Sequence, residues 1–97
     1  MGFFGPGIPA GCGEMNVEEI NEPIGVLASF SGGEIRPLRF RWGGRTYRIE
    51  AVNGRWIDRS GDGYSLHYSV QVGQETYYLH FAGTEVQWWL DRVVLEG

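Results

Sequence analysis

Four arginines fall within ten residues of this chain, in the stretch RFRWGGRTYR at residues 39–48. Guanidinium groups bind phosphate and carboxylate oxygens through paired N–H donors, and planar rings such as those of Phe40, Trp42 and Tyr47 can stack on nucleobases. Arginines that alternate with aromatic residues therefore favour a surface for single-stranded nucleic acid. The candidate contact residues are Arg39, Arg41, Arg45, Arg48 and Arg55.

The charge of the chain is divided unevenly along the sequence. Residues 36–59 hold seven arginines against two carboxylates, a net charge of +5, whereas the remainder carries −9 and the whole chain −4. A chain that is acidic overall lacks the strongly basic character of a stand-alone nucleic-acid-binding domain. The arginines therefore have an alternative role as internal ion-pair partners. The candidate carboxylates are Glu34, Glu50, Asp91 and Glu96.

The arginines and rings need a scaffold, and the pattern from Ile24 onward predicts an all-β domain. Apolar and polar residues alternate with a period of two, and no segment has helical periodicity. Turn signals divide this region into about six short strands, which fit a small antiparallel barrel or a curled sheet. We expect residues 1–22, rich in glycine, proline and acidic residues, to form a disordered tail before a domain at residues 23–97. Within the tail, the segment at residues 16–22 is compatible with one helical turn.

The glycine pair at residues 43–44 predicts a two-residue hairpin turn, because both positions can adopt positive φ. With the turn there, Phe40 lies opposite Tyr47 on the core side and Arg39 opposite Arg48 on the other side. Two arginines directly across from each other repel. This pair therefore calls for a nearby carboxylate or an external anion.

A second hairpin is predicted around residues 73–74, where glycine leads the turn. In that register Tyr68 faces Leu79 in the core, and His67 lies directly across from His80 on the outer side. Two histidines are candidate zinc or copper ligands, but a metal site needs more ligands than two. We therefore predict no metal. The expected core residues are Leu38, Phe40, Tyr47, Ile49, Leu66, Tyr68, Val70, Leu79 and Trp88.

Other motifs do not indicate catalysis. The loop DRSGDG at residues 58–63 has the odd-numbered oxygen ligands of a calcium loop, but Ser69 stands where the bidentate glutamate is expected, so a polar turn is the better interpretation. No serine or cysteine occupies a nucleophile motif. We predict a non-enzymatic protein without cofactors, and a last strand broken by a bulge near residues 91–92.

The cysteine content and hydropathy bear on localisation. Cys12 is the single cysteine, which excludes an internal disulfide and is typical of a reducing cytoplasm. No apolar run approaches the ~20 residues of a membrane span. We expect a cytoplasmic monomer or weak dimer with no membrane partner.

The hairpin also carries a resemblance. The segment PLRFRWGGRTYRIEAVNGRWIDR, followed by tyrosine-rich strands and WWLDRVVLEG, resembles a family of small uncharacterised bacterial β-domains. A similar arginine and aromatic hairpin occurs near the C-terminal end of inactive Y-family DNA-polymerase-like proteins of mutagenic repair cassettes. The resemblance covers roughly residues 36–96 and implies an association with DNA repair, but it supplies no catalytic residues. Because the resemblance does not include a polymerase domain, it implies the link to DNA repair by association.

Two hypotheses follow from these observations. The first is a binding module for single-stranded DNA, acting through the arginine and aromatic hairpin. The second is a protein-interaction module, with another DNA-repair protein as a candidate partner, that docks through an edge strand or through Trp89. Adjacent strand residues point to opposite faces, so one of Trp88 and Trp89 should lie outside the core.

Overall fold

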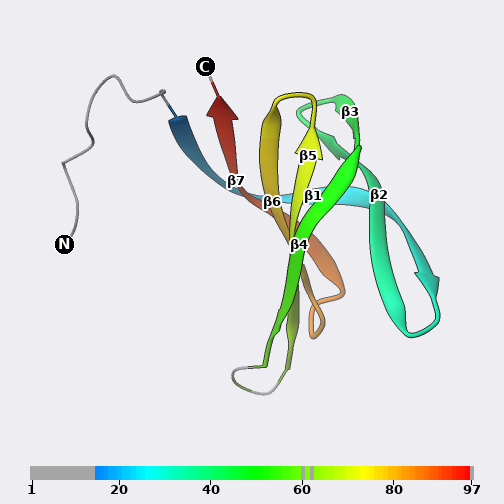
Figure 1. The fold of residues 1–97 in the computed structure, drawn as a ribbon. Helices are drawn as coiled ribbons and strands as arrows, with labels where there is room; N and C mark the ends of the chain where they lie inside the picture. The colour runs from blue at the N-terminus through cyan, green and yellow to red at the C-terminus, as the bar shows by residue number, and fades with distance from the viewer. Residues whose placement is uncertain (1–14, 60, 62, 97) are drawn as a thin grey trace.

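The computed structural model describes residues 15–59, 61 and 63–96, and it confirms the all-β prediction. One antiparallel sheet of seven strands, in the order β3-β2-β1-β7-β6-β5-β4, curls into a half-barrel (Figure 1). The strands are β1 (Met15–Ser31), β2 (Glu34–Trp42), β3 (Arg45–Arg48), β4 (Ala51–Asp58), β5 (Ser65–Val72), β6 (Glu75–Ala82) and β7 (Gln87–Glu96). The sheet has one more strand than expected because the segment at residues 45–52 breaks after Arg48.

Both predicted hairpin registers are confirmed. In the β2–β3 hairpin Phe40 pairs with Tyr47 and Arg39 with Arg48, and the two turn glycines have φ values of 63° and 80°. These positive values are those that a two-residue turn between right-twisted strands requires. In the β5–β6 hairpin His67 lies directly opposite His80. The short turns therefore fix which residues share a face.

Strand β1 connects the two halves of the sheet. Its first part pairs with β7 and its second part, from Gly25, pairs with β2. Residues 15–22, assigned to the tail in the sequence analysis, are thus part of this strand, and the helical turn expected at residues 16–22 is wrong. Pairing with β7 satisfies the backbone of this segment, and an irregularity between Glu19 and Glu22 lets it follow the curl of the sheet. Residues 1–14 lie outside the described residues.

The core lies on the inner face of the half-barrel. Most of the expected core residues are there: Phe40, Tyr68, Val70, Leu79 and Trp88 are buried, and Tyr47, Ile49 and Leu66 are partly buried against them. The prediction for Leu38 is wrong, because this side chain is 41% exposed. Leu27 pairs with Arg39 and Ala28 with Pro37, so Leu38 is the extra residue of a β-bulge. The bulge turns Leu38 outward, and Pro37 is buried in its place.

The half-barrel closes at one end and stays open at the other. Near the β3–β4 corner the Ile49 N–H donates to the carbonyl of Leu38, and the Glu50 N–H donates to that of Gln71. Farther along, side-chain contacts replace backbone pairing between β2 and the β4–β5 hairpin. The phenol of Tyr68 donates a hydrogen bond to the carbonyl oxygen of Ile35 across this opening.

Candidate functional site

Three arginines of the predicted contact set share the outer face of the β2–β3 hairpin. Arg39 and Arg41 on β2 and Arg48 on β3 are exposed, and Arg39 lies directly opposite Arg48. Within the described residues, none of the three makes an ion pair or a side-chain hydrogen bond with a carboxylate. The internal carboxylate expected to offset the Arg39–Arg48 repulsion is therefore not found in the described part of the chain.

A fourth arginine joins this group because of the bulge in β2. In a regular strand every second residue shares a face, so Arg36 would lie on the core side with Phe40. The extra residue Leu38 shifts this alternation by one, and Arg36 therefore lies on the outer side. Arg36 is exposed and follows the same side as Arg39 and Arg41, next to buried Pro37. Arg36 is not among the contact residues predicted from the sequence, because bulges have no strong sequence signal. We call the group of Arg36, Arg39, Arg41 and Arg48 the basic face.

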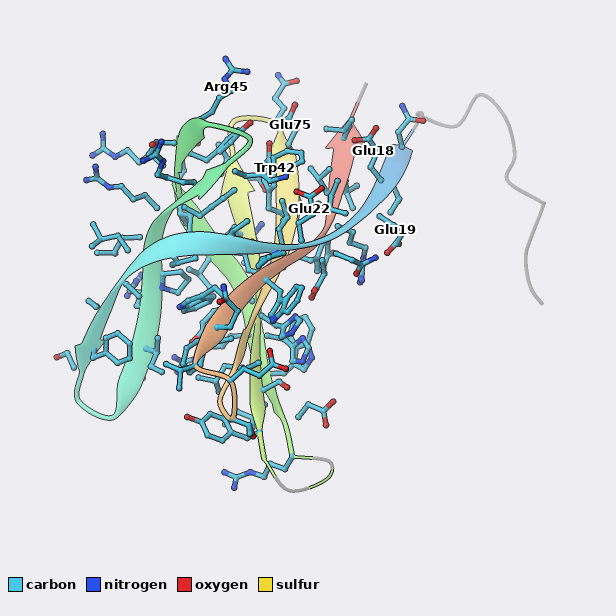
Figure 2. All side chains as sticks on the ribbon, turned by 180° about the vertical axis from the view of Figure 1, so that it is seen from behind. Glu18, Glu19, Glu22, Trp42, Arg45 and Glu75 are labelled. Carbon is cyan, nitrogen blue, oxygen red and sulfur yellow. The ribbon has the colours of Figure 1, made fainter. Side chains whose placement is uncertain are left out.

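The other two predicted contact residues lie elsewhere. Arg45 pairs with Trp42 in the hairpin register and so belongs to the inner side of the sheet, near the rim where Glu75 lies (Figure 2). Arg55 lies opposite Tyr68 on the inner side of β4, and its Nη2 is 3.0 Å from Oε2 of Glu34. This hydrogen bond and the charge of Arg55 lower the pKa of the Glu34 carboxyl.

The aromatic rings of the hairpin also point away from the basic face. Phe40 stacks on Tyr47 with centroids 5.0 Å apart, and Tyr77 packs against both rings inside the half-barrel. Trp42 donates from Nε1 to Oε1 of Glu22 at 3.0 Å (Figure 2). These rings stabilise the fold, and they do not provide stacking platforms beside the basic face.

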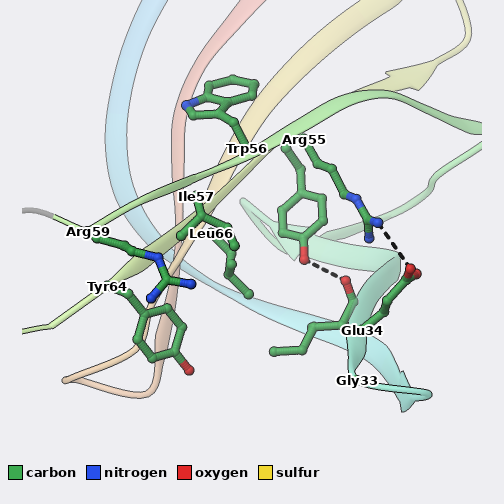
Figure 3. A pocket seen from close by; sticks show the side chains of 10 residues that line it. Gly33, Glu34, Arg55, Trp56, Ile57, Arg59, Tyr64 and Leu66 are labelled. Carbon is green, nitrogen blue, oxygen red and sulfur yellow. Dashed lines mark hydrogen bonds and ion pairs between the residues drawn. The ribbon is translucent and has the colours of Figure 1, made fainter.

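A pocket of about 630 Å³ occupies the open side of the half-barrel (Figure 3). Its lining combines apolar side chains with the Arg55–Glu34 pair at one end and Arg59 near the other. Because Glu34 already neutralises Arg55, this end is a poor site for an anion. The apolar side chains of the lining are those of Ile35, Ile57, Tyr64, Leu66 and Tyr68; Trp56 also borders the pocket, but its indole points away from it (Figure 3).

Four flat side chains form a continuous stack across the outer face of β4, β5, β6 and β7. Trp56, His67, His80 and Trp89 occupy directly paired positions, with successive ring centroids 5.4, 5.1 and 6.3 Å apart. We call this row the ring ladder. Trp89, the predicted interaction residue, does lie outside the core, but one face of its ring stacks on His80 and its Nε1 donates to Glu85 at 3.3 Å.

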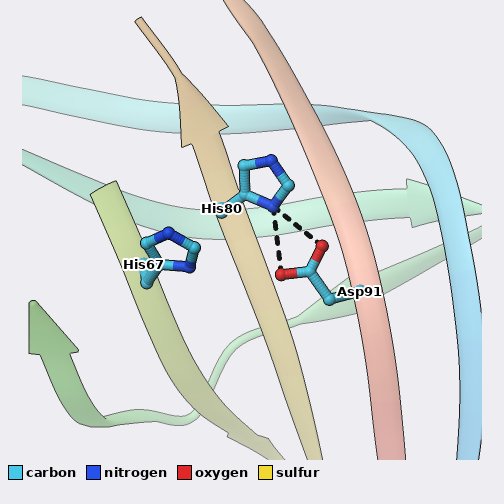
Figure 4. A group of neighbouring side chains, drawn as sticks. All are labelled: His67, His80 and Asp91. Atoms are coloured by element: carbon cyan, nitrogen blue, oxygen red, sulfur yellow. Dashed lines mark hydrogen bonds and ion pairs between the residues drawn. The ribbon is translucent and has the colours of Figure 1, made fainter. Parts of the chain in front are cut away.

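The predicted bulge in the last strand is present, and it brings a carboxylate to the ring ladder. Tyr78 pairs with Arg92 and Leu79 with Leu90, so Asp91 is the extra residue. Its Oδ1 and Oδ2 lie 2.7 and 3.0 Å from Nδ1 of His80 (Figure 4). The hairpin register predicts the histidine pair from the sequence, but Asp91 becomes its neighbour only through the bulge.

His67 lies in the middle of the ring ladder without a hydrogen-bond partner among the described residues. Burial, followed by the charge of His80, lowers its pKa. Its imidazole therefore stays neutral more readily than a free histidine.

Ser60 and Asp62 of the calcium-like loop at residues 58–63 lie outside the described residues.

The chain matches no protein-family model, no curated protein and no solved structure. The described part of the chain contains no helix with the length and hydropathy needed to cross a membrane.

Proposed function

We propose that this domain is a non-enzymatic module that binds the phosphate backbone of single-stranded nucleic acid through the basic face. The observation that supports this most directly is the Arg39–Arg48 pair. Two exposed guanidinium groups lie directly opposite each other with no carboxylate partner in the described chain. Like charges at such positions destabilise a sheet, whereas a bound anion would offset their repulsion.

The arrangement favours contacts with phosphates over contacts with bases. Arg39 and Arg41, two residues apart on β2, are separated by about 6.6 Å along the strand, and Arg36 extends the row on the other side of the bulge. That spacing suits a flexible chain of phosphates. Because the hairpin rings face inward, base stacking contributes little and the expected binding is independent of base sequence.

The resemblance to the C-terminal hairpin of inactive Y-family polymerase-like proteins points in the same direction. It supports single-stranded DNA, such as that present during repair, as the ligand. The alternative of a protein partner at Trp89 is less favoured, because His80 already covers one face of this indole.

The test compares two sets of charge-neutralising variants in the same hairpin. Replacing all four arginines of the basic face with glutamine is expected to abolish binding of a fluorescein-labelled oligothymidylate at low salt. Arg39→Gln alone should weaken binding. Arg45→Gln, which removes one arginine from the inner side of the same hairpin, is its matched control and should retain binding. Anisotropy titrations measure both. Equal losses of DNA affinity in Arg39→Gln and Arg45→Gln would mean that the DNA responds to net charge and not to the basic face. A wild-type chain that does not bind the oligothymidylate at low salt would contradict the proposal.

A further inference from the structure

The ring ladder contains the only two histidines of the sequence, and the bulge in β7 adds a carboxylate beside them. One nitrogen from each histidine and one oxygen of Asp91 all lie within 4.8 Å of one another (Figure 4). From this geometry we propose that His67, His80 and Asp91 form a binding site for a divalent first-row transition-metal ion such as Zn²⁺ or Cu²⁺. This site is separate from the basic face and does not depend on it.

The donor set fits this class of ion. Imidazole nitrogen binds zinc, copper and nickel well, and a carboxylate oxygen is a common third ligand, whereas Mg²⁺ and Ca²⁺ require sites made of oxygen. Two neutral imidazoles and one carboxylate carry a charge of −1, which compensates part of the charge of a divalent ion. The guanidinium of Arg92, which follows Asp91 in the sequence, lies 4.3 Å from the ring centre of Tyr78.

The distances require only a small closure of the site. Metal–ligand bonds of about 2.1 Å hold two ligand atoms no more than ~4.2 Å apart. The Asp91 oxygens already lie within 3.0 Å of His80 Nδ1. The three ligand atoms lie within 4.8 Å of one another, so side-chain rotations of about one to two ångströms bring them to the ~3.4 Å separation of a tetrahedral site.

The surroundings hold the ligands in place on rigid strands. Trp56 stacks on His67 at 10° and Trp89 on His80 at 9°, so each imidazole is packed against an indole. The bulge directs the Asp91 carboxylate toward His80, which is a recurrent use of bulges near binding sites. The side chains of His80 and Asp91 keep 23% and 21% exposure, so an ion can enter from solvent and water can complete its coordination.

The direct test uses the untagged chain in a Cys12→Ser background, which removes its single thiol. In separate calorimetric titrations the chain should bind one Zn²⁺ or one Cu²⁺ at this site. Cu²⁺ should bind more tightly than Zn²⁺, and Mg²⁺ should not bind. Cu²⁺ should also quench tryptophan fluorescence, because Trp56 and Trp89 contact the imidazoles. At a free Zn²⁺ concentration of 100 times Kd, the thermal midpoint should rise by roughly 11–22 °C.

The variants identify the ligands. His67→Gln, His80→Gln and Asp91→Asn should each weaken Zn²⁺ binding by at least about 10-fold. Glu85→Gln removes a carboxylate bonded to Trp89 but outside the site, and it should bind Zn²⁺ as the parent does. Circular dichroism without metal checks that each variant is folded.

A second measurement needs no substitution. Long-range ¹H–¹⁵N spectra of the wild-type chain should show Zn²⁺-dependent shifts of both imidazoles. Binding that survives the His67→Gln/His80→Gln double variant, shifts at one imidazole alone, or no binding of Zn²⁺ and Cu²⁺ would each overturn the proposal.

Discussion

Replacing Arg39 or Arg48 with glutamine separates the cost of these charges to the fold from their use in binding. The two side chains are exposed and directly opposed, and neither has a carboxylate partner within the described residues. Cross-strand pairs change stability by roughly 0.2–1 kcal/mol, and like charges act unfavourably. Each substitution should therefore leave the free energy of unfolding unchanged or raise it by up to about 0.5 kcal/mol, which corresponds to a rise in the thermal midpoint of ~2–4 °C.

The same substitutions should reduce the salt dependence of binding. Each phosphate contact with single-stranded DNA contributes about 0.7 to the slope of log K against log salt. Four arginines give a slope near −2.8, so affinity should fall about 50-fold between roughly 50 and 200 mM salt. The Arg39→Gln variant should have a slope near −2.1 and a fall of about 20-fold, and the Arg39→Gln/Arg48→Gln variant a slope near −1.4 and a fall of about 7-fold.

Anisotropy titrations at four salt concentrations and thermal melts of the same samples measure both effects. Arg45→Gln is the control for the slope. A drop in the thermal midpoint of more than a few degrees for Arg39→Gln would show that this guanidinium has an internal partner. A slope that does not change would show that Arg39 does not contact phosphate. The first result would contradict the expected stability change, and the second would contradict a role of Arg39 in binding.

Three further predictions concern the fold. Leu38→Ser should change the free energy of unfolding by less than ~0.5 kcal/mol in denaturant titrations, because the bulge exposes Leu38. The control Leu79→Ala, at a buried position, should lower it by about 2–5 kcal/mol. Equal losses in the two variants would place Leu38 in the core. Gly44→Ala should lower stability by about 1 kcal/mol in thermal melts, since φ is 80° there, and no loss would mean that the turn adopts another conformation. Burial raises the pKa values of Tyr68 and Tyr77 above the ordinary 10.0. The phenols therefore lose their protons more readily in the unfolded than in the folded chain, so the free energy of unfolding should fall as the pH rises above 10.0. Tyr68→Phe should make this loss of stability at alkaline pH smaller in thermal melts. At neutral pH it should lower the free energy of unfolding by about 1 kcal/mol, because the hydrogen bond to Ile35 is lost. A pH dependence identical to that of the parent chain would contradict the prediction for Tyr68.

The hairpins could be predicted from the sequence because short turns fix register. Once the glycine pair at residues 43–44 was placed at the turn, side-chain alternation assigned Phe40 to the core and Arg39 to the outer face, and the structure agrees. In the second hairpin the same alternation predicts His67 opposite His80, which the structure confirms. Local turn chemistry carried this information, so no knowledge of the whole sheet was needed.

The extent of β1 could not be predicted in this way. The segment at residues 15–22 is acidic, and its pairing with β7 depends on a partner more than 60 residues later in the chain. Val17 remains 52% exposed and Ile20 is only partly buried against the core, so little apolar burial holds this segment in place. The strand forms because β7 supplies backbone partners, which is a property of the assembled sheet.

Two bulges decide what the outer face can do. In β2 the extra residue Leu38 reverses the alternation and moves Arg36 to the side of Arg39, and in β7 the extra residue Asp91 reaches His80. A strict period of two through either position gives a smaller group, three arginines in one case and two histidines in the other. The strands and hairpins could be predicted from the sequence, but the positions of the bulges could not, because a bulge adds one residue without a strong sequence signal. All members of the basic face and of the histidine–aspartate cluster are therefore identified only in the three-dimensional structure.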